Sequence, residues 1–346
     1  MGRVSTEPAP TPVPAPRSLL AAPSDAGAAT VLARSRDELA AALADAPDPR
    51  AVVMTMGALH EGHFDLVREA ARRVGSAGTV VVTIFVNPLQ FAPTEDLDSY
   101  PRDLEGDLAG LTRTLTGVDG ALGVGRLVVF APTPEVIYPA GQPAVRIDPG
   151  PIATVLEGRT RPTHFAGVCQ VVLTLMHLTA PRWALFGRKD AQQLAIIESM
   201  VRDLAVPLEI VPVDIRRESD GLAMSSRNAY LSPEQRRQAL ALSRALQAGQ
   251  DVAAQAAGSG TRLDPAAIRR AALASLEAAD GVEIDYVALV DPAGFEDLTD
   301  AGLGLPRRAP VHEDAGEGLP AVGLLAVAAR VGTTRLIDNT LIDLLP

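Results

Sequence analysis

The stretch Met56-Gly-Ala-Leu-His-Glu-Gly-His63 lies between an apolar run, residues 51–56, and an amphipathic run, residues 64–74. This order predicts a buried strand, a turn that contains glycine, and a helix that begins beside the turn. A helix start presents unpaired backbone N–H groups and the positive end of the helix dipole, which favours a bound phosphate. Gly57 and Gly62 allow positive φ and close backbone approach. The stretch therefore predicts a nucleotide-phosphate pocket that contains two imidazoles, His60 and His63.

Two other interpretations of the histidines are possible. The zinc motif HExxH also combines His and Glu, but only two residues separate His60 from His63, so the i,i+4 ligand spacing is absent. No cysteine or carboxylate-plus-histidine set elsewhere in the sequence completes a zinc sphere. A purely structural role is the second alternative, because short motifs also match by chance.

Short apolar runs alternate with helical stretches through the first two thirds of the chain. We expect strands at residues 51–56, 79–86, 126–131, 183–186 and 208–215, and helices at 64–74, 102–116, 165–179 and 190–204. Continuous apolar runs are typical of parallel strands covered on both faces. The alternation predicts an α/β fold with a doubly wound, Rossmann-like parallel sheet, in which ligands bind at the carboxyl ends of strands.

The pattern changes after residue 215. Two alanine-rich helices at 233–256 and 264–279 precede strands at 283–290, 324–329 and 333–339, which indicates an antiparallel sheet. We therefore expect three parts: a disordered Pro/Ala-rich extension over 1–28, a Rossmann-like domain over 29–215, and a smaller C-terminal α+β lid domain over 216–346. Residues 309–318 have the composition of a loop insertion, and Ser35-Arg-Asp-Glu38 resembles a capping box that begins a short helix.

The composition excludes several classes of protein. The chain has 346 residues, 47% hydrophobic content and a net charge of −11, so we expect a folded protein that binds neither nucleic acid nor membrane surfaces. No apolar segment approaches the roughly 20 residues of a membrane span, and no secretory signal is recognisable. Cys169, the single cysteine, lies in an apolar run, which is consistent with the cytoplasm.

Five further blocks follow the histidine motif along the chain. They are Phe85-Val-Asn-Pro-Leu-Gln-Phe91; Tyr100-Pro-Arg102; Glu157-Gly158 with Arg161-Pro-Thr-His-Phe-Ala-Gly-Val168; Phe186-Gly-Arg-Lys-Asp190 with Gln192-Gln-Leu194; and Met224-Ser-Ser-Arg-Asn228. The HxGH pattern resembles the signature of nucleotidylyl-transferring enzymes. With the other blocks, residues 31–341 resemble the pantothenate synthetase family. Six blocks in the same order make a chance match very improbable.

The resemblance implies a ligase of pantothenate and coenzyme A biosynthesis. Its members condense pantoate with β-alanine through a pantoyl adenylate, consuming ATP with Mg²⁺ and releasing AMP and pyrophosphate. It also implies a homodimer with small-molecule partners only. The implied ATP-binding residues are Met56, Gly57, Ala58, Leu59, His60, Glu61, Gly62, His63, Gly187, Arg188, Lys189, Asp190, Arg216, Met224, Ser225, Ser226 and Arg227.

The same resemblance implies individual roles. His60, His63, Lys189 and Arg227 would be catalytic, with the histidines supplying hydrogen bonds and positive charge and His63 acting as proton donor. Gln90 and Gln193 would contact pantoate, Gln90 also β-alanine, and Arg161 and His164 would help to hold pantoate or phosphate. Asp107 would help to hold magnesium. In isolation each of these residues also fits a solvent-facing turn or a helix cap.

Three positions depart from the family pattern. Arg188 stands where Glu is common, Ala191 where Tyr is usual, and Arg216 where Val is frequent. The changes at 188 and 191 lie beside Lys189 and Asp190 and put ATP affinity in doubt, whereas the contact at Arg216 would survive if it is made through the backbone. Two other classes of protein stay open: a nucleotidylyl transferase, which would share the HxGH pocket but use a phosphate acceptor, and a non-catalytic ATP-sensing module, for which Arg188 and Ala191 would be signs of lost activity.

Overall fold

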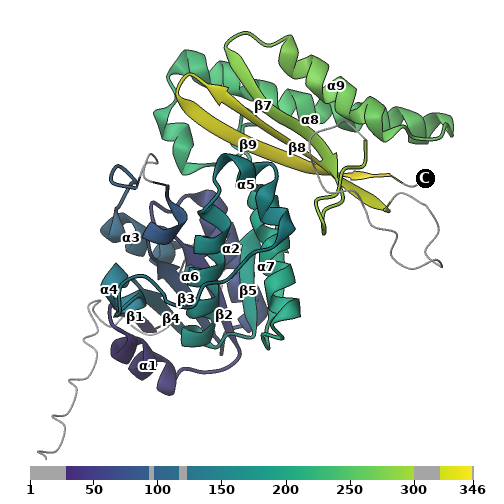
Figure 1. The fold of residues 1–346 in the computed structure, drawn as a ribbon. Helices are drawn as coiled ribbons and strands as arrows, with labels where there is room; N and C mark the ends of the chain where they lie inside the picture. The colour runs from purple at the N-terminus through teal and green to yellow at the C-terminus, as the bar shows by residue number, and fades with distance from the viewer. Residues whose placement is uncertain (1–28, 93–96, 117–122, 300–319, 345–346) are drawn as a thin grey trace, which may run out of the picture.

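The computed structural model describes residues 29–92, 97–116, 123–299 and 320–344, which form a larger and a smaller domain that meet near α5 (Glu157–Thr160) (Figure 1). The predicted extension over 1–28 and the predicted loop insertion over 309–318 lie outside these residues. No helix in the described part is long and apolar enough to cross a membrane.

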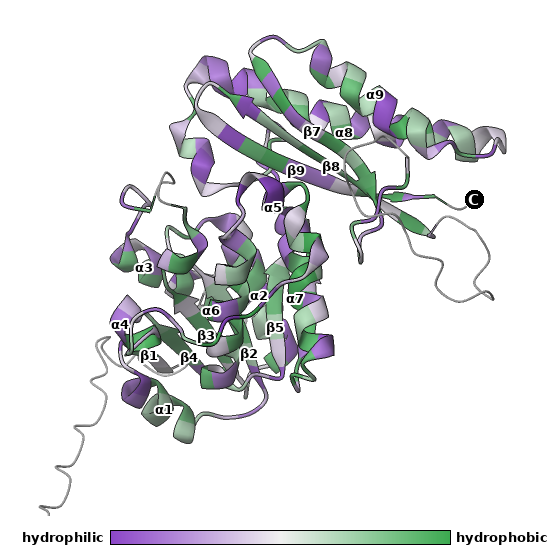
Figure 2. Ribbon diagram, viewed as in Figure 1, coloured by the Kyte–Doolittle hydropathy of each residue, from purple (hydrophilic) through white to green (hydrophobic). Residues whose placement is uncertain are grey.

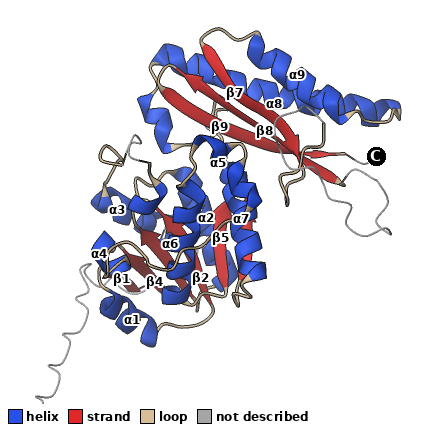
Figure 3. Ribbon diagram, viewed as in Figure 1, coloured by secondary structure: helices blue, strands red, loops and turns tan. Residues whose placement is uncertain are grey.

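The larger domain is built on a six-stranded parallel sheet in the order β1-β4-β3-β2-β5-β6. Figure 3 draws its strands in red among the blue helices. Its strands are β1 (Ala29–Ala33), β2 (Arg50–Thr55), β3 (Thr79–Ile84), β4 (Arg126–Phe130), β5 (Trp183–Gly187) and β6 (Glu209–Val213). The five predicted strands are confirmed with small shifts at their ends. The edge strand β1 was not predicted, because its five residues directly follow the Pro/Ala-rich segment and carry no pattern of their own.

Helices cover both faces of this sheet, as expected for a doubly wound fold. They are α1 (Arg36–Ala44), α2 (Glu61–Val74), α3 (Leu104–Thr116), α4 (Pro134–Ile137), α5 (Glu157–Thr160), α6 (His164–Thr179) and α7 (Ala191–Asp203), with one-turn helices η1 (Pro88–Gln90), η2 (Pro151–Thr154) and η3 (Arg188–Asp190). Val52 packs with α1, α6 and α7, whereas its neighbour Val53 packs with α2 and α3. The strands therefore carry apolar side chains on both faces, which explains their continuous apolar runs. These strands are drawn largely in the hydrophobic colour in Figure 2.

The smaller domain is a three-stranded antiparallel sheet with two helices on one face. Its elements are η4 (Ser226–Tyr230), α8 (Pro233–Ser259), α9 (Pro265–Glu277), β7 (Val282–Val290), β8 (Val322–Val331) and β9 (Thr334–Asp343), with strand order β7-β8-β9. The predicted helices and antiparallel sheet are confirmed. β9 continues four residues beyond the predicted end at Asn339.

The second face of the small sheet packs against the larger domain. Tyr286, Ala288 and Ala326 share an apolar cluster with Leu156 and Ala195 of the larger domain. Beside this cluster the Arg335 guanidinium bonds both carboxylate oxygens of Glu157, at 2.6 and 2.7 Å. The hydroxyl of Tyr286 donates to the same carboxylate at 2.8 Å. The contact between the domains thus combines an apolar core with a nearly buried ion pair. The boundary near residue 215 stays a proposal.

Candidate active site

The strand order explains why four distant sequence blocks meet. β3, β2, β5 and β6 are neighbours, and their carboxyl ends lead into η1, the histidine turn, η3 and the segment at Arg216. The order in which strands are added reverses between β2 and β5, because β3 and β4 extend the sheet on one side of β2 whereas β5 and β6 extend it on the other. Doubly wound sheets bind ligands at such a point. A cavity of about 250 Å³ lies there. Its lining includes Met56, His60, Gly62, His63, Gln90, Arg161, His164, Gly187, Lys189, Asp190, Gln193, Arg216, Met224, Ser225, Ser226 and Arg227.

The side chain of Asp107 anchors the backbone of the turn from Met56 to His63. Gly57 and Ala58 both have positive φ, +86° and +50°, which bends the chain sharply after β2. The Asp107 carboxylate, 3% exposed, accepts the backbone N–H of Leu59 at 2.6 Å and that of Ala58 at 3.1 Å. Asp107 therefore fixes the backbone that precedes His60. Its burial raises the pKa of this carboxyl, and the two backbone hydrogen bonds oppose that effect.

The two imidazoles stack at the start of α2, with ring centroids 4.1 Å apart. Burial and then the neighbouring His60 lower the pKa of His63 to about 3, and burial and then Lys189 lower the pKa of His60. The lowered pKa values favour the neutral form of both rings, and the positive charge expected from the pair stays a prediction. The Nδ1 atom of His63 accepts the backbone N–H of His60 at 3.3 Å. The buried Nδ1 of His60 has no hydrogen-bond partner among the described residues.

Gln90 enters the cavity from η1, and its side chain is held by two neighbours, Met56 and Asn87. Its amide donates to the Met56 sulfur at 3.0 Å, and its side-chain oxygen accepts from Asn87 at 3.2 Å. Asn87 in turn donates to the Gly167 carbonyl at 3.0 Å and accepts from the Tyr138 hydroxyl at 2.9 Å. The orientation of Gln90 is therefore fixed by the protein before any ligand binds.

α6 closes the cavity behind Gln90 because Gly167 permits a very close approach. A Cβ atom at Gly167 would lie 2.3 Å from the Leu89 carbonyl oxygen. His164 at the start of α6 contacts the Gln90 carbonyl through Nδ1 at 3.1 Å and the Arg161 guanidinium through Nε2 at 3.2 Å. Arg161 and His164, the two residues predicted to hold pantoate or phosphate, thus both lie on the cavity wall.

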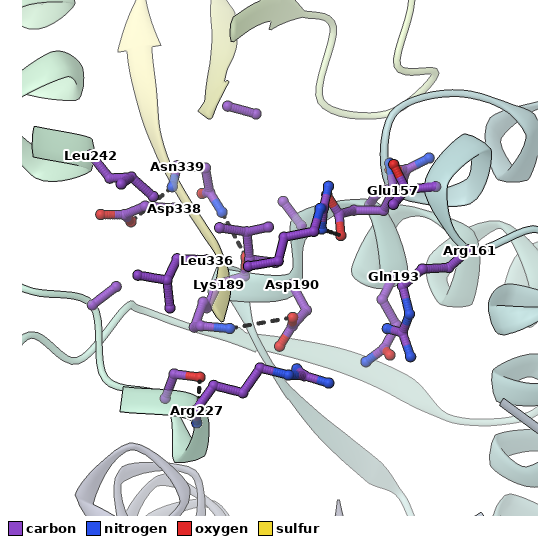
Figure 4. Close-up of a pocket in the computed structure, with 18 of the residues that line it drawn as sticks. Glu157, Arg161, Lys189, Asp190, Gln193, Arg227, Leu242, Leu336, Asp338 and Asn339 are labelled. Atoms are coloured by element: carbon purple, nitrogen blue, oxygen red, sulfur yellow. Dashed lines mark hydrogen bonds and ion pairs between the residues drawn. The ribbon is translucent and has the colours of Figure 1, made fainter. Parts of the chain in front are cut away.

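Lys189 and Gln193 come from η3 and the first turn of α7 and lie close to Arg161 and Arg227 (Figure 4). The Lys189 ammonium is 3.5 Å from the Asp190 carboxylate. Desolvation raises the pKa of Asp190, but the charges of Lys189, His164 and Arg227 outweigh it and leave this pKa below its usual value. The adjacent Gln192 is buried and bonds the carbonyls of Ile152 and Val155, so it is a packing residue.

The segment from Arg216 to Arg227 covers the start of α2. The sulfur of Met224 lies 3.3 Å from the backbone nitrogen of Gly62, on a helix N–H that is otherwise available to an anion. Ser225 caps η4 by accepting the Arg227 backbone N–H at 3.3 Å. The Arg216 side chain turns outward to Asp65. This segment and η3 face each other across the cavity.

Several predicted nucleotide contacts do not line the cavity. Gly57, Ala58, Leu59, Glu61 and Arg188 are absent from its wall. The backbone N–H groups of Ala58 and Leu59 are bonded to Asp107, Glu61 pairs with Arg68, and Arg188 pairs with Asp214.

The magnesium role expected for Asp107 is not supported, because both of its carboxylate oxygens accept backbone N–H groups. Nowhere in the described residues do three or more His, Cys, Asp or Glu side chains gather as a metal site. Within the part of the chain that the structure describes, side chains therefore form no protein cage for Mg²⁺.

Some residues at the site had no role predicted for them. Asn87 lies in the same sequence block as Gln90, three residues before it, and this closeness could have indicated that Asn87 holds the Gln90 side chain. Asp338 and Asn339 of β9 line a second cavity of about 500 Å³, which shares Lys189 and Arg227 with the first. No local pattern distinguishes these two residues from ordinary strand positions.

Comparison with known proteins gives a consistent result. The family model described as Pantoate-beta-alanine ligase matches residues 31–341. The chain is 50% identical over 317 residues to a pantothenate synthetase of a Nocardioides species, covering 90% of this chain and 85% of that protein. It is 45% identical over 352 residues to one from Streptomyces avermitilis, covering 90% and 97%.

Solved structures agree with the sequence comparison. The pantothenate synthetase of Thermus thermophilus superposes with a TM-score of 0.74 at 40% identity, covering 91% of this chain and 99% of that one. The pantoate-beta-alanine ligase of Francisella tularensis, solved with a β-γ ATP compound and β-alanine, gives a TM-score of 0.64 at 28% identity, covering 90% and 98%.

Proposed function

The chain belongs to the pantoate–β-alanine ligase family, and from this premise we propose that the cavity between β2 and β5 is where ATP, pantoate and β-alanine react. The protein condenses pantoate with β-alanine through a pantoyl adenylate and releases AMP and pyrophosphate. One observation carries the location: both histidines of the turn line the same cavity as Gln90, Gln193 and Lys189. A phosphate site and two amides suited to a hydroxy acid thus lie within reach of each other.

In the first step an oxygen of the pantoate carboxylate attacks the α-phosphorus of ATP, and pyrophosphate leaves. Gln90 and Gln193 orient the acid, and the fixed hydrogen bonds of Gln90 reduce the cost of that orientation. Lys189, Arg227 and the start of α2 stabilise the charge that grows on the phosphates. Because its Nδ1 accepts the backbone N–H of His60, neutral His63 carries its proton on Nε2 and can donate it in a hydrogen bond to a phosphate oxygen. The phosphate charge also raises the lowered pKa values of both histidines, which favours the protonated form in which His63 acts as proton donor.

In the second step the neutral amine of β-alanine attacks the acyl carbon. The new amide nitrogen loses a proton, and AMP leaves with the electron pair of the broken C–O bond. The adenylate must be kept from water during this step, so we propose that the segment from Met224 to Arg227 and the small domain cover the cavity. Arg161 and His164 would complete the pantoate wall.

We further propose that ATP acts as its magnesium complex, with the metal held by the phosphates rather than by a protein carboxylate cluster. A homodimer and a cytoplasmic location are proposed on the family resemblance; the single cysteine, which is buried and unpaired, is consistent with a reducing compartment.

The test measures AMP and pyrophosphate from ATP, pantoate and β-alanine. Pyrophosphate is expected from ATP and pantoate alone in a single turnover, and AMP release is expected only after β-alanine is added. A nucleotidylyl transferase would not need the amine, and an ATP sensor would give neither product. Lys189→Ala should abolish most of the adenylation, whereas Arg202→Ala, an exposed cation on α7, should leave it unchanged.

A further inference from the structure

Asn339 is a buried amide on β9 of the small domain whose partners lie in the other domain. Its side-chain nitrogen donates to the backbone carbonyl of Lys189 at 2.8 Å and to that of Arg188 at 3.0 Å. Both hydrogen atoms of the amide are therefore used on consecutive residues of η3, the turn that carries Lys189 (Figure 4). Asn339 is only 6% exposed.

The preceding residue, Asp338, makes a matching contact to the other side of the cavity. Its carboxylate, 3% exposed, pairs with both terminal nitrogens of Arg217, at 2.6 and 3.0 Å. Arg217 also donates to the Gly221 carbonyl and pairs with Ala223 in an isolated β-bridge. This brace directly precedes Met224 and the segment that ends in Arg227.

The position of these two residues is itself fixed by the strand ladder. Asp338 lies opposite Val327 and Asn339 opposite Ala326 in an unbroken antiparallel register with β8. Neighbouring side chains on a strand point to opposite faces, so two adjacent residues can reach two different partners. One rigid pair of β9 thus holds the turn of Lys189 and the segment of Arg227 at a set separation.

A buried amide without hydrogen bonds costs free energy, so a strand position of this kind usually carries an apolar side chain. We propose that Asn339, with Asp338, is a positioning residue pair: from the small domain it sets where Lys189 lies relative to Arg227 for attack on ATP. This inference rests on the proposed function of Lys189. Asn339 touches no reacting atom; it acts through the backbone of η3.

The first test compares Asn339→Ala, Asn339→Asp and Asn339→Ser in single-turnover adenylation. Asn339→Ala should slow adenylation by roughly 100-fold, the loss typical of a catalytic group misplaced by about 1 Å. Asn339→Asp should be at least as slow, because its carboxylate would face two carbonyl oxygens, whereas Asn339→Ser keeps one donor and should recover part of the rate. Asp343→Asn, an exposed change at the far end of β9, is the matched control and should have the normal rate.

The decisive test is a double-mutant cycle with Lys189→Ala. If Asn339 acts through Lys189, Asn339→Ala should cost less than about threefold once Lys189 is absent, since residues that act as a unit are not additive. Equal losses in both backgrounds, or a normal rate in Asn339→Ala, would overturn the inference. Thermal unfolding of each variant ensures that rates are compared below its unfolding transition; if Asn339→Ala does not fold, Asn339→Ser is used in the same cycle.

Different results would refute the proposed function and the role of Asn339. A wild-type protein that forms no pyrophosphate from ATP and pantoate would refute the proposed function. An active wild-type protein with an additive cycle would refute only the role of Asn339.

Discussion

The two domains contribute to the same cavity in different ways. The large domain supplies groups that can touch a ligand, such as His63, Gln90 and Lys189, from the ends of three neighbouring strands. The sheet of the small domain supplies Asp338 and Asn339, whose partners are protein groups. Substitutions in the large domain should therefore alter the chemistry directly, whereas substitutions in the sheet of the small domain should alter it by displacing catalytic groups.

The largest effect is expected from His63→Ala. Removing one preorganised donor to a developing phosphate charge should reduce the rate of pantoyl-adenylate formation by roughly 100- to 1000-fold, with the fold intact by circular dichroism. His177→Ala, an exposed histidine of α6, is the matched control. Near-normal single-turnover adenylation in His63→Ala would show that His63 has no direct part in the chemistry.

Asp107→Asn tests whether a residue of the large domain can also affect the rate only by positioning a catalytic group, here His60. Asn keeps one acceptor, but its amide nitrogen would face a backbone N–H of Ala58 or Leu59. The turn before His60 should shift, and adenylation should fall by roughly 10- to 100-fold. Glu105→Gln, exposed on the same helix, should have no such effect. Rescue of Asp107→Asn by raised Mg²⁺ would instead favour a metal role.

The lowered pKa of His63 predicts a specific dependence of stability on pH. Below pH 6.5 the unfolded chain binds a proton at this histidine, whereas the folded protein does not until about pH 3, so stability falls as the pH falls through this window. His63→Gln should reduce the loss between pH 6.5 and pH 5 by at most about 2 kcal/mol, at about 1.4 kcal/mol per pH unit. Urea unfolding at both pH values measures it. An unchanged difference would mean that His63 titrates normally.

The smallest effect is expected from Arg227→Ala. This cation lies at the edge of the cavity, so its loss should slow adenylation about tenfold. Amide formation from supplied pantoyl adenylate should be affected less, because no pyrophosphate leaves in that step. Arg237→Ala, exposed on α8, is the control. Equal losses in both half-reactions would assign Arg227 to general closure of the cavity rather than to phosphate charge.

The sequence predicted most of the large domain because its signals are local. A buried strand, a glycine turn and an amphipathic helix are all visible between residues 51 and 74, and the sheet order then brings Gln90 to the same place. β1 was missed because five residues beside a Pro/Ala-rich segment have no period to detect. The roles of Asp107 and Asn339 could not be predicted, since their partners lie 49 and 150 residues away in the chain. The charge state of the histidines depends on burial, which no motif encodes.

The apolar cluster between the domains makes it unfavourable to produce either domain as a separate fragment. Ala288 and Ala326 of the small sheet are buried by Leu156 and Ala195, and the Arg335–Glu157 pair is sealed beside them. A fragment cut near residue 215 would expose that apolar face and a carboxylate without its guanidinium, which favours self-association. Calorimetry of the intact protein should accordingly record one cooperative melting event, with neither half surviving the other.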